Sequence, residues 1–179
     1  MTYMINHFGP FYLTYLLFDL LSQAKEARII NVASKIHFNA KESLVKDMDC
    51  SKDWGSMDSY AKSKLANVMF TVSLADKLSN RPNMKSVSLH PGVVASDFYN
   101  GSCILKFFKC CCCCFLVNNE RGAMASLHTS RVEFSKLRSG LYYDDDTNIK
   151  EMNKIAQNRT ECQELWEASE KVYGIKFDI

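Results

Sequence analysis

A tyrosine and a lysine stand four residues apart, Tyr60 and Lys64, in a segment whose apolar residues recur every three or four positions. That period predicts an amphipathic helix over 59–78, and the four-residue step puts both side chains on one face of it. An ammonium beside a phenol favours the phenolate, which lets tyrosine exchange a proton with an alcohol or carbonyl oxygen. The alternative is a solvated Tyr–Lys pair without a chemical role, and the spacing alone does not decide.

Helices and short apolar strands alternate around this pair. The predicted elements are a buried helix at 3–24, a strand at 28–33, the helix at 59–78, a strand at 86–90, a helix at 119–132, a strand at 140–143 and a closing helix at 150–173. The polar stretch 35–58 has no clear period and is expected to be a loop. Such alternation predicts an α/β layered fold with a parallel sheet.

Further polar residues follow the ends of the predicted strands. Ser34 comes directly after the first strand, and Pro91-Gly92 ends the second. The carboxyl ends of parallel strands meet at one edge of a sheet, where ligands bind in folds of this kind. These residues are therefore expected to lie near the helix that carries Tyr60.

The composition is that of one ordinary globular domain. The chain has 179 residues, of which 47% are hydrophobic and 23% charged, and its few Gly and Pro exclude a collagen-like or low-complexity chain. A net charge of +2 with scattered basic residues argues against nucleic-acid binding. No signal-peptide pattern opens the chain, and the cysteines are not spaced as a disulfide framework. We therefore expect a cytoplasmic protein that is not secreted.

Several segments stand in a fixed order along the chain. They are Asn6-His7-Phe8-Gly9-Pro10-Phe11, Arg28-Ile29-Ile30-Asn31-Val32-Ala33-Ser34, Tyr60-Ala61-Lys62-Ser63-Lys64-Leu65-Ala66-Asn67, His90-Pro91-Gly92, Arg121-Gly122-Ala123 and the run 158–166. This ordered set resembles the short-chain dehydrogenase/reductase family, and more narrowly its retinol-dehydrogenase-like branch. The resemblance covers nearly the whole chain, so 1–179 is interpreted as a single partial domain. It implies a partial Rossmann-type doubly wound parallel sheet, with about three strands and flanking helices.

By resemblance, the chain would take part in NAD(P)-dependent interconversion of an alcohol and a carbonyl on a small lipophilic substrate such as a retinoid or steroid. NADP is favoured over NAD, and no metal is implied. Tyr60 would be the proton donor and acceptor, Lys64 would lower its pKa, and Ser34 would orient the substrate oxygen. Asn6 would hold a water in the proton relay. The implied cofactor-binding residues are Tyr60, Lys64, Pro91, Gly92, Val94 and Ser96.

One part of the family pattern has no counterpart. None of the seven glycines belongs to the glycine-rich turn that holds the cofactor pyrophosphate in such proteins. The resemblance therefore implies the C-terminal half of the fold, and the isolated chain is expected to bind dinucleotide weakly and to be marginally stable. The alternative stays open that the chain is a truncated, non-catalytic remnant acting as a membrane-associated or partner-binding module.

Two regions bear on partners. The segment from Cys103 to Val117 holds five consecutive cysteines among apolar and aromatic residues. It is interpreted either as a peripheral contact with an intracellular membrane or as a buried apolar loop, since zinc binding would need a different ligand spacing. The two long helices, at 3–24 and 59–78, are the surfaces through which the resemblance implies a homo- or heterodimer.

Overall fold

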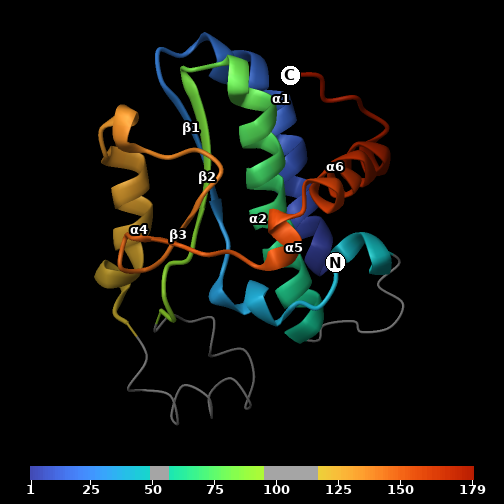
Figure 1. Cartoon of the computed structure of the whole chain (residues 1–179), viewed down its shortest axis with the longest axis horizontal. Helices are drawn as coiled ribbons and strands as arrows, with labels where there is room; N and C mark the ends of the chain where they lie inside the picture. The colour runs from blue at the N-terminus through green and yellow to red at the C-terminus, as the bar shows by residue number, and fades with distance from the viewer. Residues whose placement is uncertain (49–56, 95–116) are drawn as a thin grey trace.

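A computed structural model describes residues 1–48, 57–94 and 117–179 (Figure 1). Its sheet has the strand order β1-β2-β3-β4, with β1 at Ala27–Val32, β2 at Met84–Leu89, β3 at Tyr142–Tyr143 and β4 at Ile149–Lys150. The first three strands are parallel, with Ala27 opposite Met84 and Val32 opposite Leu89, and β4 returns antiparallel to β3. The expected α/β fold of the partial Rossmann type is confirmed. The two-residue β4 was not predicted, because so short a strand carries no pattern of alternation.

Helices cover both faces of this sheet. They are α1 at Gly9–Gln23, preceded by the π-helical turn η1 at Met4–Phe8, α2 at Met57–Lys77, α4 at Asn119–Arg131, α5 at Lys154–Gln157 and α6 at Arg159–Tyr173. Figure 1 shows α1, α2 and α6 on one face of the sheet and α4 on the other. Because β1, β2 and β3 are parallel, their carboxyl ends lie together at one edge of this covered sheet.

The closing helix predicted at 150–173 is wrong in its first part. Lys150 belongs to β4, and the helical chain is interrupted at Asn158, whose backbone is extended with φ −83° and ψ 107°. The Asn158 side chain accepts hydrogen bonds from the first amides of α6, and this capping starts a new helix there. The end of α6 at Gly174 agrees with the prediction, since Gly174 adopts a left-handed φ of 61°.

The stretch 35–58 is not a single loop. It contains the 3₁₀ turns η2 at Lys35–Asn39 and η3 at Leu44–Asp47, while α2 already begins at Met57 and residues 49–56 lie outside the described residues. Each turn begins after a serine, because Ser34 Oγ accepts from the amide of Ile36 and Ser43 Oγ accepts from the amide of Val45. The serine caps, rather than an apolar period, were the signal in the sequence.

The helix α2 lies at the centre of the molecule. It packs against β1 and β2 on one side and against η1, α5 and α6 on the other. Three aromatic rings join the helices: the centroids of Phe11 and Phe70 lie 5.3 Å apart, and those of Phe11 and Trp166 lie 5.1 Å apart. Because α2 is enclosed on these sides, its residues hold a fixed place relative to the sheet.

Candidate active site

The chemistry-bearing pair lies at the start of α2. Lys64 Nζ is 5.6 Å from the centroid of the Tyr60 ring, and it donates a hydrogen bond to the carbonyl of Val32 at 3.0 Å. Val32 is the last residue of β1, so this bond fixes the ammonium at the carboxyl end of the sheet. Burial lowers the pKa of Lys64. The structure thus places Tyr60 and Lys64 together at the sheet edge where the sequence predicted them.

Polar side chains attach α2 to β1 behind this pair. Asn67 Nδ2 donates to the same Val32 carbonyl at 3.4 Å, and Asn31 Nδ2 donates to Thr71 Oγ1 at 2.9 Å. Thr71 Oγ1 in turn donates to the carbonyl of Asn67 at 2.9 Å. These contacts were not singled out from the sequence, although the spacing of Lys64, Asn67 and Thr71 on a buried helix is a signal for them.

Ser34 stands two residues beyond Val32, at the same end of β1. Its Oγ accepts a hydrogen bond from the amide of Ile36 at 3.3 Å, and its carbonyl accepts from the amide of His37 at 3.0 Å. Because Oγ is the acceptor in this cap, the hydroxyl proton is left to donate to a ligand oxygen. Ser34 and Lys64 are therefore brought to one end of one strand.

Asn6 is connected to the site through hydrogen bonds of Ser63. Asn6 Nδ2 donates to Ser63 Oγ at 3.1 Å, and Ser63 Oγ donates to the carbonyl of Tyr60 at 2.7 Å. Ser63 is fully buried and was not singled out from the sequence. The side chain of Asn6 is thereby linked to the helical turn that carries Tyr60.

The loop after β2 turns at a glycine. Gly92 has φ of +83°, a left-handed conformation that glycine adopts without strain. Pro91 precedes it, and Val94 pairs with Val117 in a parallel bridge, with the amide of Val117 donating to the carbonyl of Val93 at 2.9 Å. Ser96, the last of the predicted cofactor-binding residues, lies outside the described residues.

Gly122 of α4 lets this loop approach the helix. A Cβ at Gly122 would lie well inside contact distance of Val94 Cγ2. We expect Gly122→Ala to destabilise the protein by about 1–3 kcal/mol, because overpacking of this size forces the loop or the helix to shift. Urea unfolding measures the loss. Val94→Ala removes the methyl that would clash and should recover most of the stability in the double variant; an unchanged loss would show that the close contact is not its cause.

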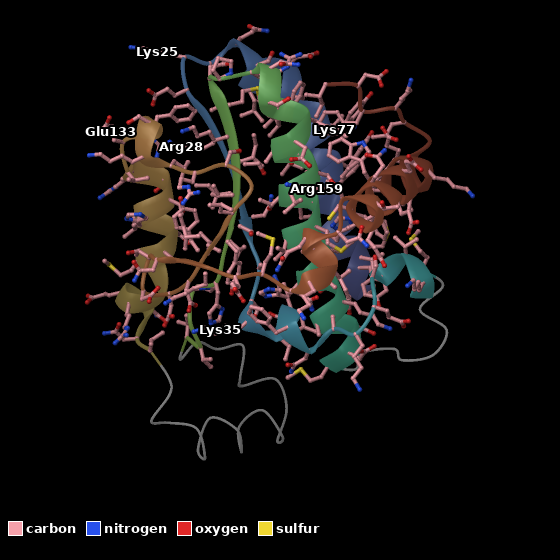
Figure 2. All side chains as sticks on the ribbon, viewed as in Figure 1. Lys25, Arg28, Lys35, Lys77, Glu133 and Arg159 are labelled. Atoms are coloured by element: carbon pink, nitrogen blue, oxygen red, sulfur yellow. The ribbon has the colours of Figure 1, made fainter. Side chains whose placement is uncertain are left out.

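An ionic cluster borders the site on the side of β3. Lys35, the residue after Ser34, pairs with Asp144 at 3.0 Å and with Asp145 at 3.4 Å. His90, the residue after β2, is almost fully buried, and burial lowers its pKa. Figure 2 shows Lys35 at the edge of the sheet where β1 and β2 finish. No motif in the sequence connects these residues, which lie about 110 positions apart.

Two further features of the described residues concern a membrane and a metal ion. Within 1–48, 57–94 and 117–179, no helix is long and apolar enough to cross a membrane, and no cluster of three or more His, Cys, Asp and Glu is arranged to hold a metal ion. Most of the segment from Cys103 to Val117, with the cysteine run, lies outside these ranges, so both interpretations of it stay predictions.

Comparisons with known proteins agree on the family. A model described as "short chain dehydrogenase" matches residues 1–102. Retinol dehydrogenase 12 of Mus musculus is 32% identical over 174 residues, which cover 97% of this chain and 54% of that protein. This chain thus spans about half the length of the curated relatives that it matches.

Solved structures share the fold. A protein from Mycobacterium Paratuberculosis superposes with a TM-score of 0.71 at 22% identity, over 97% of this chain and 59% of that one. The NADPH-bound carbonyl reductase from chicken fatty liver gives a TM-score of 0.59 at 22% identity, over 84% of this chain and 55% of that one. The ordered motifs, the parallel sheet and the matching family model lead to one conclusion: this chain belongs to the short-chain dehydrogenase/reductase family and is similar to its retinol dehydrogenases.

Proposed function

We propose that the chain supplies the catalytic half of an NAD(P)-dependent oxidoreductase that interconverts an alcohol and a carbonyl on a lipophilic substrate. The observation that carries the proposal is the bond from Lys64 Nζ to the Val32 carbonyl, because it fixes the Tyr60–Lys64 pair at the strand end that precedes Ser34. The retinol dehydrogenases among the relatives support a retinoid-like substrate by their names.

The residues present fit the nicotinamide end of a dinucleotide. The left-handed turn at Gly92 and the close approach of Val94 to Gly122 place a tight loop at the same edge of the sheet as Lys64. In the proposal, Tyr60, Lys64, Pro91, Gly92, Val94 and Ser96 hold the nicotinamide and its ribose. When bound, the nicotinamide supplies or accepts the hydride. NADP is favoured over NAD on the family resemblance.

The chain's own residues would handle the proton. Tyr60 Oη exchanges it with the substrate oxygen, and the Lys64 ammonium favours the phenolate that results. The Ser34 hydroxyl donates to the same oxygen and holds the carbonyl carbon toward the cofactor. Asn6 positions a water that carries the proton onward, and its bond to Ser63 supports that role by tying it to the turn of Tyr60.

A second candidate is a partner-binding module without catalysis. The observation in its favour is a row of exposed leucines along one side of α1, formed by Leu13, Leu16, Leu17 and Leu20. Exposed apolar rows of this length are typical of interfaces. The dimer that the family resemblance implies, with a second copy or with a relative of the same family, belongs to this candidate. Its exposed surface would be on α1, because most residues of α2 are buried.

A chimeric protein distinguishes the two candidates. The part of mouse retinol dehydrogenase 12 that precedes its match to this chain is joined to residues 1–179, and NADPH oxidation is followed with retinaldehyde as substrate. The proposal expects turnover in the chimera and weak NADPH binding by the 179-residue chain alone. A chimera that binds NADPH but leaves it unoxidised would favour the non-catalytic candidate.

A further inference from the structure

Two contacts with a distant segment of the chain hold the turn that contains Ser34. Both come from the segment that follows β3, more than a hundred residues further along the chain. The first joins Lys35 to the carboxylates of Asp144 and Asp145, and the second joins His37 to Asn153. Between them they fix the residues on the C-terminal side of Ser34.

The partners of the Lys35 ion pair differ in how far their side chains are exposed to solvent. The Lys35 side chain is 53% exposed, whereas those of Asp144 and Asp145 are 10% and 21% exposed. Partial burial alone would lower the pKa of Lys35, but the two carboxylates outweigh it and raise that pKa. The carboxylates are themselves set by a tight turn, in which the amide of Asp145 donates to Asp144 Oδ1 at 3.0 Å and the amide of Thr147 donates to the Asp144 carbonyl at 2.9 Å.

Asp145 also borders the loop after β2. A Cβ built on Gly92 would meet Asp145 Oδ2 at 3.4 Å, which is ordinary contact distance. The same carboxylate therefore faces Lys35 on one side and the Gly92 turn on the other. The two parts of the proposed site, the Ser34 turn and the nicotinamide loop, are bridged by one acidic residue.

The contact of His37 supports the same turn. His37 is fully buried; its Nδ1 lies 2.6 Å from the Ser34 carbonyl, and its Nε2 accepts from the amide of Asn153 at 3.3 Å. Asn153 Nδ2 donates to the carbonyls of His37 and Ala40 at 2.9 and 3.0 Å. His37 therefore anchors the buried end of the turn. The ion pair of Lys35 holds the other end, where Ser34 lies.

We propose that Lys35 is a positioning residue: held by Asp144 and Asp145, it keeps the Ser34 hydroxyl at a fixed position relative to the Gly92 loop. The role in catalysis rests on the proposed function, since Lys35 would act only through Ser34. The tether itself is a property of the chain and is open to test without any substrate.

Hydrogen exchange on the 179-residue chain tests the tether. Lys35→Met removes both ion pairs from a half-exposed position. The matched control is Lys150→Met, which removes the ion pair with Asp146 (3.0 Å) in the β3–β4 hairpin that also carries Asp144 and Asp145. The amides of Ile36 and His37, which donate to Ser34, should exchange about fivefold faster in the first variant and at the original rate in the second. Asp145→Asn should act in the same direction. Unchanged exchange at both amides would overturn the proposal.

Turnover of the chimera tests the positioning. Lys35→Met should lower kcat by about tenfold, because a small misplacement of a group that orients the substrate is costly. In a Ser34→Ala background the same substitution should have no further effect, a non-additivity that a general loss of stability would not produce. Additive effects would overturn the proposal. If the chimera binds NADPH but is inactive while the exchange result holds, the proposed function fails and the tether stands.

Discussion

Replacing Tyr60 by phenylalanine is expected to lower turnover of the chimeric enzyme by a factor of about 10²–10⁴, the usual contribution of a positioned acid–base group. The substitution removes one oxygen and leaves the ring, which lies 5.6 Å from Lys64 Nζ. The bond of Lys64 to the Val32 carbonyl does not use that oxygen, so the strand end should keep its structure. NADPH binding, measured by titration calorimetry, should change little.

Tyr12→Phe is the matched control for this substitution. Tyr12 lies on α1, where its ring stacks on that of Tyr173 with centroids 4.3 Å apart. The loss of its hydroxyl should leave turnover unchanged, because the stacking contact depends on the ring. Substantial residual turnover in Tyr60→Phe, with Tyr12→Phe unaffected, would remove Tyr60 from the proposed role.

The second large effect concerns pH and the buried residue His7. Burial lowers the pKa of His7 from 6.5 to about 4, and its Nε2 lies 3.0 Å from Ser169 Oγ on α6. Because the unfolded chain takes up a proton near pH 6.5 and the folded chain does not, stability is full above that pH and falls as the pH drops toward 4. The whole shift corresponds to about 3 kcal/mol, of which about 2 kcal/mol should be lost between about pH 7 and pH 5.

Urea unfolding at the two pH values measures this loss. His37 and His90 have pKa values lowered by burial as well, so their contributions have the same sign. His7→Gln keeps a polar group near Ser169 without the titration and should lose most of the pH dependence assigned to His7. His128→Gln, on α4, should retain it. Equal pH dependence in the protein and in His7→Gln would show that His7 is not the source.

The fold could be predicted largely because the local patterns agree with the tertiary structure. The period of α2 and the β-branched run of β1 identified both elements, and Gly174 marked the end of α6. The failures have local causes too. Asn158 starts a new helix by capping it, and β4 exists only because the tight turn after β3 returns the chain, which no apolar pattern reveals.

The site was predictable only where residues carry their chemistry in a local motif. Tyr60 and Lys64 share one helix, and Ser34 directly follows a strand, so their positions followed from the expected elements. The contacts of Lys35 with Asp144 and of His37 with Asn153 span more than a hundred residues. No local pattern in either segment predicts which residue the other segment will contact. Ser63, which connects Asn6 to Tyr60, also becomes visible only in three dimensions.

A crystal structure of the chimera with NADPH and an unreactive carbonyl analogue tests the central claim without measuring rates. It shows whether the Tyr60 phenol and the Ser34 hydroxyl bind the same oxygen. The account predicts that Tyr60 Oη and Ser34 Oγ both lie within hydrogen-bond distance of the analogue's oxygen, with Lys64 beside the nicotinamide ribose. An analogue oxygen bound by neither side chain, with the nicotinamide away from the carboxyl end of β1, would contradict it.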